Sequence, residues 1–92
     1  NMSFMRQAIV TKYHGPTNTR GSRISATTES GLRHYYPYQY QLNSEGNHAD
    51  AAQKMAEHMG WDGTWRGGAI PGAYVFVLDD GALFTIAPDT NR

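Results

Sequence analysis

The chain has 92 residues, and its eight Lys and Arg residues balance its eight Asp and Glu residues, so the formal net charge is zero. This length predicts a single domain over residues 1–92 with a modest core, and a homodimer would add buried surface. The zero net charge argues against a generally basic nucleic-acid binder, although it permits a local basic patch. The sequence contains no cysteine, which excludes disulfides, cysteine zinc sites and thiol catalysis.

No stretch is long and apolar enough to cross a membrane. The start also lacks a signal-peptide pattern, because Arg6 and Gln7 interrupt its apolar residues. We therefore expect a soluble cytoplasmic protein with no membrane partner. Asn1 precedes Met2, and we interpret Asn1 as a cloning remnant.

Three strand-like runs open the chain, at residues 4–13, 23–28 and 32–42. The first has a short apolar centre with polar flanks, which is typical of a strand rather than a helix. The third alternates tyrosines with polar residues, so that Tyr36, Tyr38 and Tyr40 should share one face. Its Pro37 predicts a position at the edge of the sheet or at a bulge.

Residues 47–59 form the one convincing helical pattern. Asn47 is a good N-cap, and Asp50 completes an arrangement close to a capping box. Gly60 suits the left-handed position that ends a helix, followed by Trp61 packing back on the last turn. The predicted buried face consists of Ala49, Ala52, Met55, Ala56 and Met59.

The remaining chain predicts a glycine-rich connection at 62–72 and then two strands. Residues 73–78 are the most apolar run and predict a central, buried strand. The sequence Asp79-Asp80-Gly81 indicates a hairpin that leads into a last strand at 82–87. We expect an ordered core over 4–87 and a loose tail over 88–92.

This element order predicts an α+β domain, β-β-β-α-β-β, with a mainly antiparallel sheet of five strands. One amphipathic helix can cover only one face of such a sheet. The other face is then open to solvent, a partner or a second copy of the chain.

The polar connection after the first strand is the best candidate for a ligand site. It is richer in hydroxyls, amides and arginines than a turn requires, and glycines flank it. Glycine lets the backbone approach a ligand, and arginine gives charge-assisted bonds to phosphate. An anion-binding loop and a loop that satisfies its own hydrogen bonds fit about equally well. The candidate ligand-binding residues are His14, Thr17, Asn18, Thr19, Arg20, Ser22 and Arg23.

No catalytic constellation is visible, so we predict a non-enzymatic protein without a metal or cofactor. We interpret His34 as an ordinary strand residue, and His48 and His58 as surface residues of the helix. We also expect the Arg23 side chain to be exposed beside the loop. Aromatic and arginine residues often anchor protein interfaces, which makes a second candidate set, for a protein partner, of Tyr35, Trp65 and Arg66.

The segment Lys12-Tyr13-His14-Gly15-Pro16-Thr17-Asn18-Thr19-Arg20-Gly21-Ser22-Arg23, followed by Asn47-His48 and Gly60-Trp61, resembles a group of small uncharacterised proteins encoded by bacteriophages and other mobile elements. The resemblance spans roughly residues 8–77, and its first motif is specific. It carries no established activity. It implies a binding role in a host cell, for example as an inhibitor of a defence system.

Two functions follow as expectations. The first is binding of a phosphate-bearing ligand, a nucleic acid or a nucleotide, through the loop at residues 15–23. The alternative is a protein-interaction module that inhibits a host enzyme or defence complex, similar in role to an anti-CRISPR protein.

Overall fold

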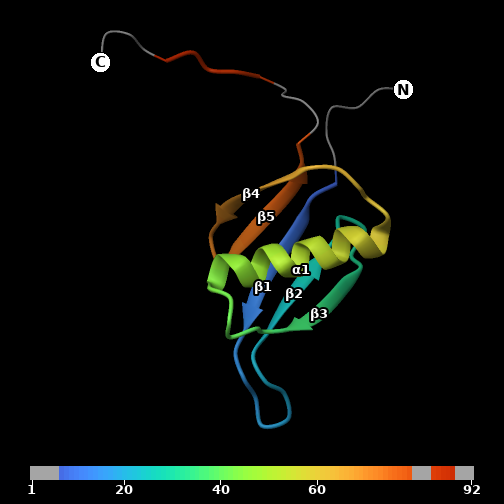
Figure 1. Cartoon of the computed structure of the whole chain (residues 1–92), viewed down its shortest axis with the longest axis vertical. Helices are drawn as coiled ribbons and strands as arrows, with labels where there is room; N and C mark the ends of the chain where they lie inside the picture. Colours follow the sequence, from blue (N-terminus) through green and yellow to red (C-terminus); the bar gives the residue numbers. More distant parts are fainter. Residues whose placement is uncertain (1–6, 80–83, 89–92) are drawn as a thin grey trace.

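The computed structural model describes residues 7–79 and 84–88. Its elements are β1 (Ile9–His14), β2 (Arg23–Thr27), β3 (Arg33–Pro37), α1 (Ser44–Met59), β4 (Trp65–Ile70) and β5 (Ala73–Leu78). The strands form one antiparallel five-stranded sheet in the order β3-β2-β1-β5-β4, as Figure 1 shows. The predicted α+β class and the order β-β-β-α-β-β are confirmed.

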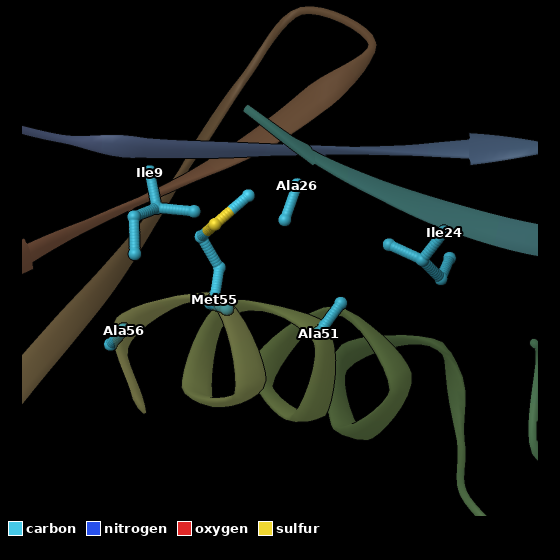
Figure 2. Packing of buried hydrophobic residues seen from close by; sticks show 7 residues of the cluster. Ile9, Ile24, Ala26, Ala51, Met55 and Ala56 are labelled. Atoms are coloured by element: carbon cyan, nitrogen blue, oxygen red, sulfur yellow. The ribbon is translucent and has the colours of Figure 1, made fainter. Parts of the chain in front are cut away.

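The helix α1 lies across one face of the sheet, mainly over β1 and β2 (Figure 1). Between the two layers lies a small core of aliphatic side chains, and Figure 2 shows Met55 pointing from α1 towards β1 and β2. Met55, Ile9 and Ile24 are almost completely buried. Much of the helix face is alanine, so α1 packs close to the sheet and the core stays thin.

The helix begins one turn earlier than predicted and ends where predicted. Asn43 is the N-cap, because its side chain accepts a hydrogen bond of 2.7 Å from the Gly46 amide. Asn47 instead lies inside the helix, where it is buried. At the other end Gly60 has φ 73°, and the Trp61 amide donates to the Ala56 carbonyl at 2.9 Å. This is the Schellman pattern expected for a terminal glycine.

The buried side of α1 also differs from the prediction. Ala49 is exposed and Met59 is half-buried, whereas Ala51 is buried. The prediction that His48 lies on the surface is wrong, because its side chain is 4% exposed. Because the helix begins earlier than predicted, its first turns lie against β1, and the side that carries His48 and Ala51 faces the sheet.

The sequence prediction missed β4 and treated its residues as a connection. β4 pairs with β5 over its whole length and joins it through Pro71 and Gly72. Gly72 has φ 73°, which suits the position after proline in a type II turn. Gly67 is needed for packing, because a Cβ atom there would lie 2.7 Å from the Phe76 ring. The glycines that suggested a loop therefore serve an edge strand.

The other strand boundaries differ at their ends. β3 stops at Pro37 and lies at the sheet edge as predicted, but Tyr40 lies beyond it and is exposed. β5 lies inside the sheet, as predicted for 73–78, yet most of it is only half-buried because α1 covers it only in part. Residues 84–87 form no strand. Some of the predicted positions lie outside the described residues: 4–6 of the first strand, 80–81 at the end of the hairpin signal, 82–83 of the last strand and 89–92 of the tail.

Candidate functional site

The face of the sheet opposite α1 brings basic and aromatic side chains together on β1, β2 and β3. Lys12 pairs with Ser25, which pairs with Tyr35, so these three positions form a row across the sheet. The neighbouring rows on the same face contribute His14 with Arg23, and Arg33. We call the set Lys12, His14, Arg23, Arg33 and Tyr35 the basic face.

Charges are segregated in this protein despite the net charge of zero. None of the five described strands contains an aspartate or glutamate. The described carboxylates lie instead on α1 and in connections, at Glu29, Glu45, Asp50, Glu57, Asp62 and Asp79. The open side of β1, β2 and β3 is therefore a local basic patch of the kind that the overall composition permits.

His14 is the last residue of β1 on the basic face, and its pKa shows the electrostatic character of this face. Its Nε2 atom is 2.9 Å from the Ser25 hydroxyl oxygen, and its ring meets the Tyr35 ring edge to face at 5.3 Å. Partial burial lowers the pKa of His14 below 6.5, and the positive charges of Arg23, Arg33 and Lys12 lower it further. A bound anion would oppose these charges and bring the pKa of His14 back up.

The His14–Ser25 pair also has the donor–acceptor geometry of a base and a hydroxyl nucleophile. Ser25, however, is only 3% exposed, so a substrate could not reach its hydroxyl. We therefore assign this hydrogen bond a positioning role, in which it fixes the His14 ring against Tyr35.

Arg23 folds back onto the protein and is not exposed as predicted. Its guanidinium carbon lies 5.3 Å from the centre of the Tyr35 ring, within cation–π range. Its Nη1 atom donates long hydrogen bonds to the carbonyls of Gly15 (3.5 Å) and Gly21 (3.4 Å). Its buried Nε–H has no partner within the described part of the chain. Arg23 thus joins the two ends of the loop to the basic face.

The loop at residues 15–22 projects beyond the end of the sheet (Figure 1). Thr17 organises its tip, because its Oγ1 accepts hydrogen bonds from the amides of Arg20 (3.0 Å) and Thr19 (3.3 Å). The Thr17 amide in turn donates to the Arg20 carbonyl at 2.7 Å. The loop therefore satisfies part of its own backbone, while the side chains of Asn18 and Arg20 lie at exposed positions.

A shallow hollow of about 300 Å³ links the loop to the basic face. Its lining includes Arg20, Ser22, Arg23 and Tyr35. Ser22 is held there by a contact of 3.0 Å between its hydroxyl and that of Tyr13. Four of the predicted ligand-binding and partner-binding residues thus line one hollow. Thr17 instead forms hydrogen bonds within the loop.

The three residues predicted to bind a protein partner do not form one surface. Tyr35 is on β3 and Trp65 on β4, at opposite edges of the sheet. Trp65 also points to the helix side, where it packs against the core. The adjacent Arg66 points to the other side and forms an ion pair of 2.7 Å with Asp79.

Sequence reasoning missed two cations of the basic face, Lys12 and Arg33. Their signal was the alternation of side chains along a strand, which places Lys12 beside His14 and Arg33 beside Tyr35 on the same face. It also missed the buried contact between Thr11 and His48, because the helix was predicted to begin too late to place His48 over β1.

Within residues 7–79 and 84–88, no three His, Asp or Glu side chains converge in the way a metal site needs. The helix in this part of the chain is too short and too polar to cross a membrane. No family model matches the chain, and neither a curated protein nor a solved structure matches it significantly.

Proposed function

We propose that this protein binds a single-stranded nucleic acid across the basic face. The observation that carries the proposal is the grouping of Lys12, His14, Arg23 and Arg33 on one open face of β1, β2 and β3, beside an exposed tyrosine, in strands without carboxylates. Proteins that bind single strands without strong sequence preference combine a positive surface with aromatic rings for base stacking.

The shape of the surface favours a polymer over a free nucleotide. The hollow beside Arg20 and Arg23 has about 300 Å³ and is shallow, so it can hold one phosphate group but does not enclose a base and a sugar. Lys12 and Arg33 lie outside it, on β1 and β3. A chain of phosphates could contact all of these cations, whereas a single nucleotide could not.

Each residue then has a distinct role. Lys12 and Arg33 would bind phosphates on the sheet, and Arg20 would reach a further phosphate from the loop. Tyr35 is 42% exposed even with Arg23 and His14 against its ring, so its exposed part could stack on a base. The polar loop thus extends the surface of the sheet rather than forming a site by itself.

The resemblance to phage proteins supports a setting for this activity, namely nucleic acid in a bacterial host cell. A module that binds a host protein remains the alternative from the same resemblance. It predicts a stoichiometric protein partner that survives nuclease treatment.

The proposal is tested by fluorescence anisotropy with labelled 12-nucleotide single strands of DNA and RNA at low salt. The wild type should bind both, and the double variant Lys12→Gln/Arg33→Gln should bind at least ten-fold more weakly. The matched control is Lys54→Gln, which removes one cation on the helix side of the protein, where Lys54 pairs with Asp50 at 2.9 Å. Absence of binding by the wild type, or equal loss in the control, would refute the proposal.

A further inference from the structure

A long apolar groove runs along the other side of the protein, between the exposed side of α1 and the strands β4 and β5. It consists of two adjoining cavities of about 510 Å³ and 500 Å³, which share Ala49, Gly67 and Phe76. One end is walled by Trp61 and Trp65, whose rings stack at 6.2 Å and 25°. We call this surface the edge groove. It exists because α1 lies mainly over β1 and β2, reaches β5 only in part and leaves β4 open.

The edge groove is bordered by a free strand edge. β4 is the last strand of the sheet, bonded to β5 on one side only, and no other described residue pairs with it. Its central residues Gly67 and Gly68 have no side chains that would keep another strand away. An unpaired strand edge with such residues is a template for pairing with a further strand.

The chain itself contains a segment that matches this edge. Residues 84–88 form no regular structure, and Phe84 and Ile86 are 75% and 83% exposed. These two large apolar side chains are two positions apart, so they point to the same side when the segment is extended. Thr85 lies between them and points to the other side. This is the pattern of a strand with one buried face.

The segment cannot complete its own hairpin. A strand that returns from β5 would pair with β5, but β5 already has β1 on one edge and β4 on the other. To reach its own β4 edge, the chain would have to pass the start of β4, where the Asp79 amide already donates to the Thr64 carbonyl at 2.7 Å. It would also then run parallel to β4, which is the slightly weaker form of pairing.

We propose that residues 84–88 of one chain add a strand to the β4 edge of a second copy, and that the second copy does the same in return. Each segment runs antiparallel to the partner's β4, with Phe84 and Ile86 inserted into the edge groove. Because each chain both gives one segment and receives one, the exchange is complete with two chains. This surface lies on the side of the sheet away from the basic face, and the inference does not depend on the proposed function.

The two tryptophans of the chain, Trp61 and Trp65, both line the edge groove, so their fluorescence reports whether the groove is occupied. Light scattering of the wild-type chain at tens of micromolar should give twice the mass of one chain. Dilution to the nanomolar range should shift the tryptophan emission to the red as the groove becomes hydrated. A monomer mass at all concentrations would overturn the proposal, whatever the emission spectrum, and so would a mass that grows beyond two chains.

A matched pair of variants tests the face of the segment. Ile86→Asp should give a monomer with red-shifted emission, whereas Thr85→Asp, with the same charge one position away, should remain a dimer. Both sites are exposed in the single chain, so the thermal midpoint measured for the dilute monomer should be unchanged. If both variants remain dimers, or both become monomers, the apolar face of the segment is not what binds.

Exchange between chains is tested by complementation. Ala49→Lys places a long charged side chain in the edge groove at an exposed position, and this variant keeps its own segment intact. Ala49→Lys and Ile86→Asp should each be monomeric alone, and a mixture should form one-to-one heterodimers with a single joined groove. A mixture that stays monomeric at high micromolar concentration would contradict exchange.

Discussion

The Nδ1 atom of His48 on α1 lies 2.7 Å from the hydroxyl oxygen of Thr11 on β1, and both residues are buried. This hydrogen bond is a polar link between the helix and the central strand. His48 also contacts the Tyr74 ring edge to face at 4.6 Å. Because the imidazole is enclosed by the sheet and the helix, its burial favours the neutral form and lowers the pKa of His48 below 6.5.

Stability should therefore fall as the pH falls below neutrality. Above pH 6.5 His48 is neutral in both the folded and the unfolded chain, so its contribution is fully present. Between 6.5 and the lowered folded pKa the unfolded chain binds the proton first, and folding becomes less favourable. Urea unfolding at pH 7.5 and 5.5 should show this loss. The loss of stability between these two pH values should be smaller in His48→Asn. In an exposed control, His58→Asn, the loss should equal that of the wild type. Equal pH dependence in all three proteins would contradict the assignment.

The end of the helix gives a backbone test. Gly60→Val should destabilise the fold by about 1–2 kcal/mol, because a branched side chain is strained at φ 73°. Gly21→Val is the control, since Gly21 lacks a positive φ and has open space around it. Thermal unfolding should show a lower midpoint for the first variant alone. An unchanged midpoint for Gly60→Val would mean that the helix ends elsewhere.

The glycine pair of β4 gives a packing test. Gly67→Ala should cost about 1 kcal/mol, because the new methyl group would collide with the Phe76 ring at 2.7 Å. Gly68→Ala meets no atom within 4 Å and should be neutral or slightly stabilising. Urea unfolding of the two variants measures the difference. The reverse order of stabilities would show that Phe76 does not lie across Gly67.

The two arginines of the loop region should separate in stability. Arg23→Ala loses the contact with Tyr35 and the link to the loop ends, and should cost about 1 kcal/mol. Arg20→Ala changes an exposed side chain and should stay within about 0.5 kcal/mol. Chemical denaturation resolves this difference. Similar values for both variants would support the sequence-based expectation that neither side chain is structural.

The sequence predicted the fold class through patterns that are local. The strand-like run at 23–28 and the helix-ending glycine after Met59 are recognised from neighbouring residues, and β2 and the end of α1 lie at these places. β4 could not be recognised in this way, because its two glycines are explained only by Phe76 on the next strand. The turn Pro71-Gly72 between two apolar pairs was the one local signal for it.

The site was predicted in part for a similar reason. The loop attracted attention through its composition, and Arg20, Ser22, Arg23 and Tyr35 indeed meet around one hollow. Lys12 and Arg33 are 21 positions apart in the sequence. Only the pairing of β1, β2 and β3 places them on the same face of the sheet. The net charge of zero did not reveal them, because it sums the basic side chains of the sheet and the acidic side chains of the helix and the connections.

The most direct test of the basic face is the salt dependence of binding to a single-stranded oligonucleotide. The logarithm of the association constant should fall linearly with the logarithm of the salt concentration, with a slope of about −0.7 for each phosphate contact. Arg33→Gln should weaken binding and reduce that slope by about 0.7, while Lys54→Gln should leave the slope unchanged. A slope for Arg33→Gln equal to that of the wild type would show that the basic face does not contact the phosphates.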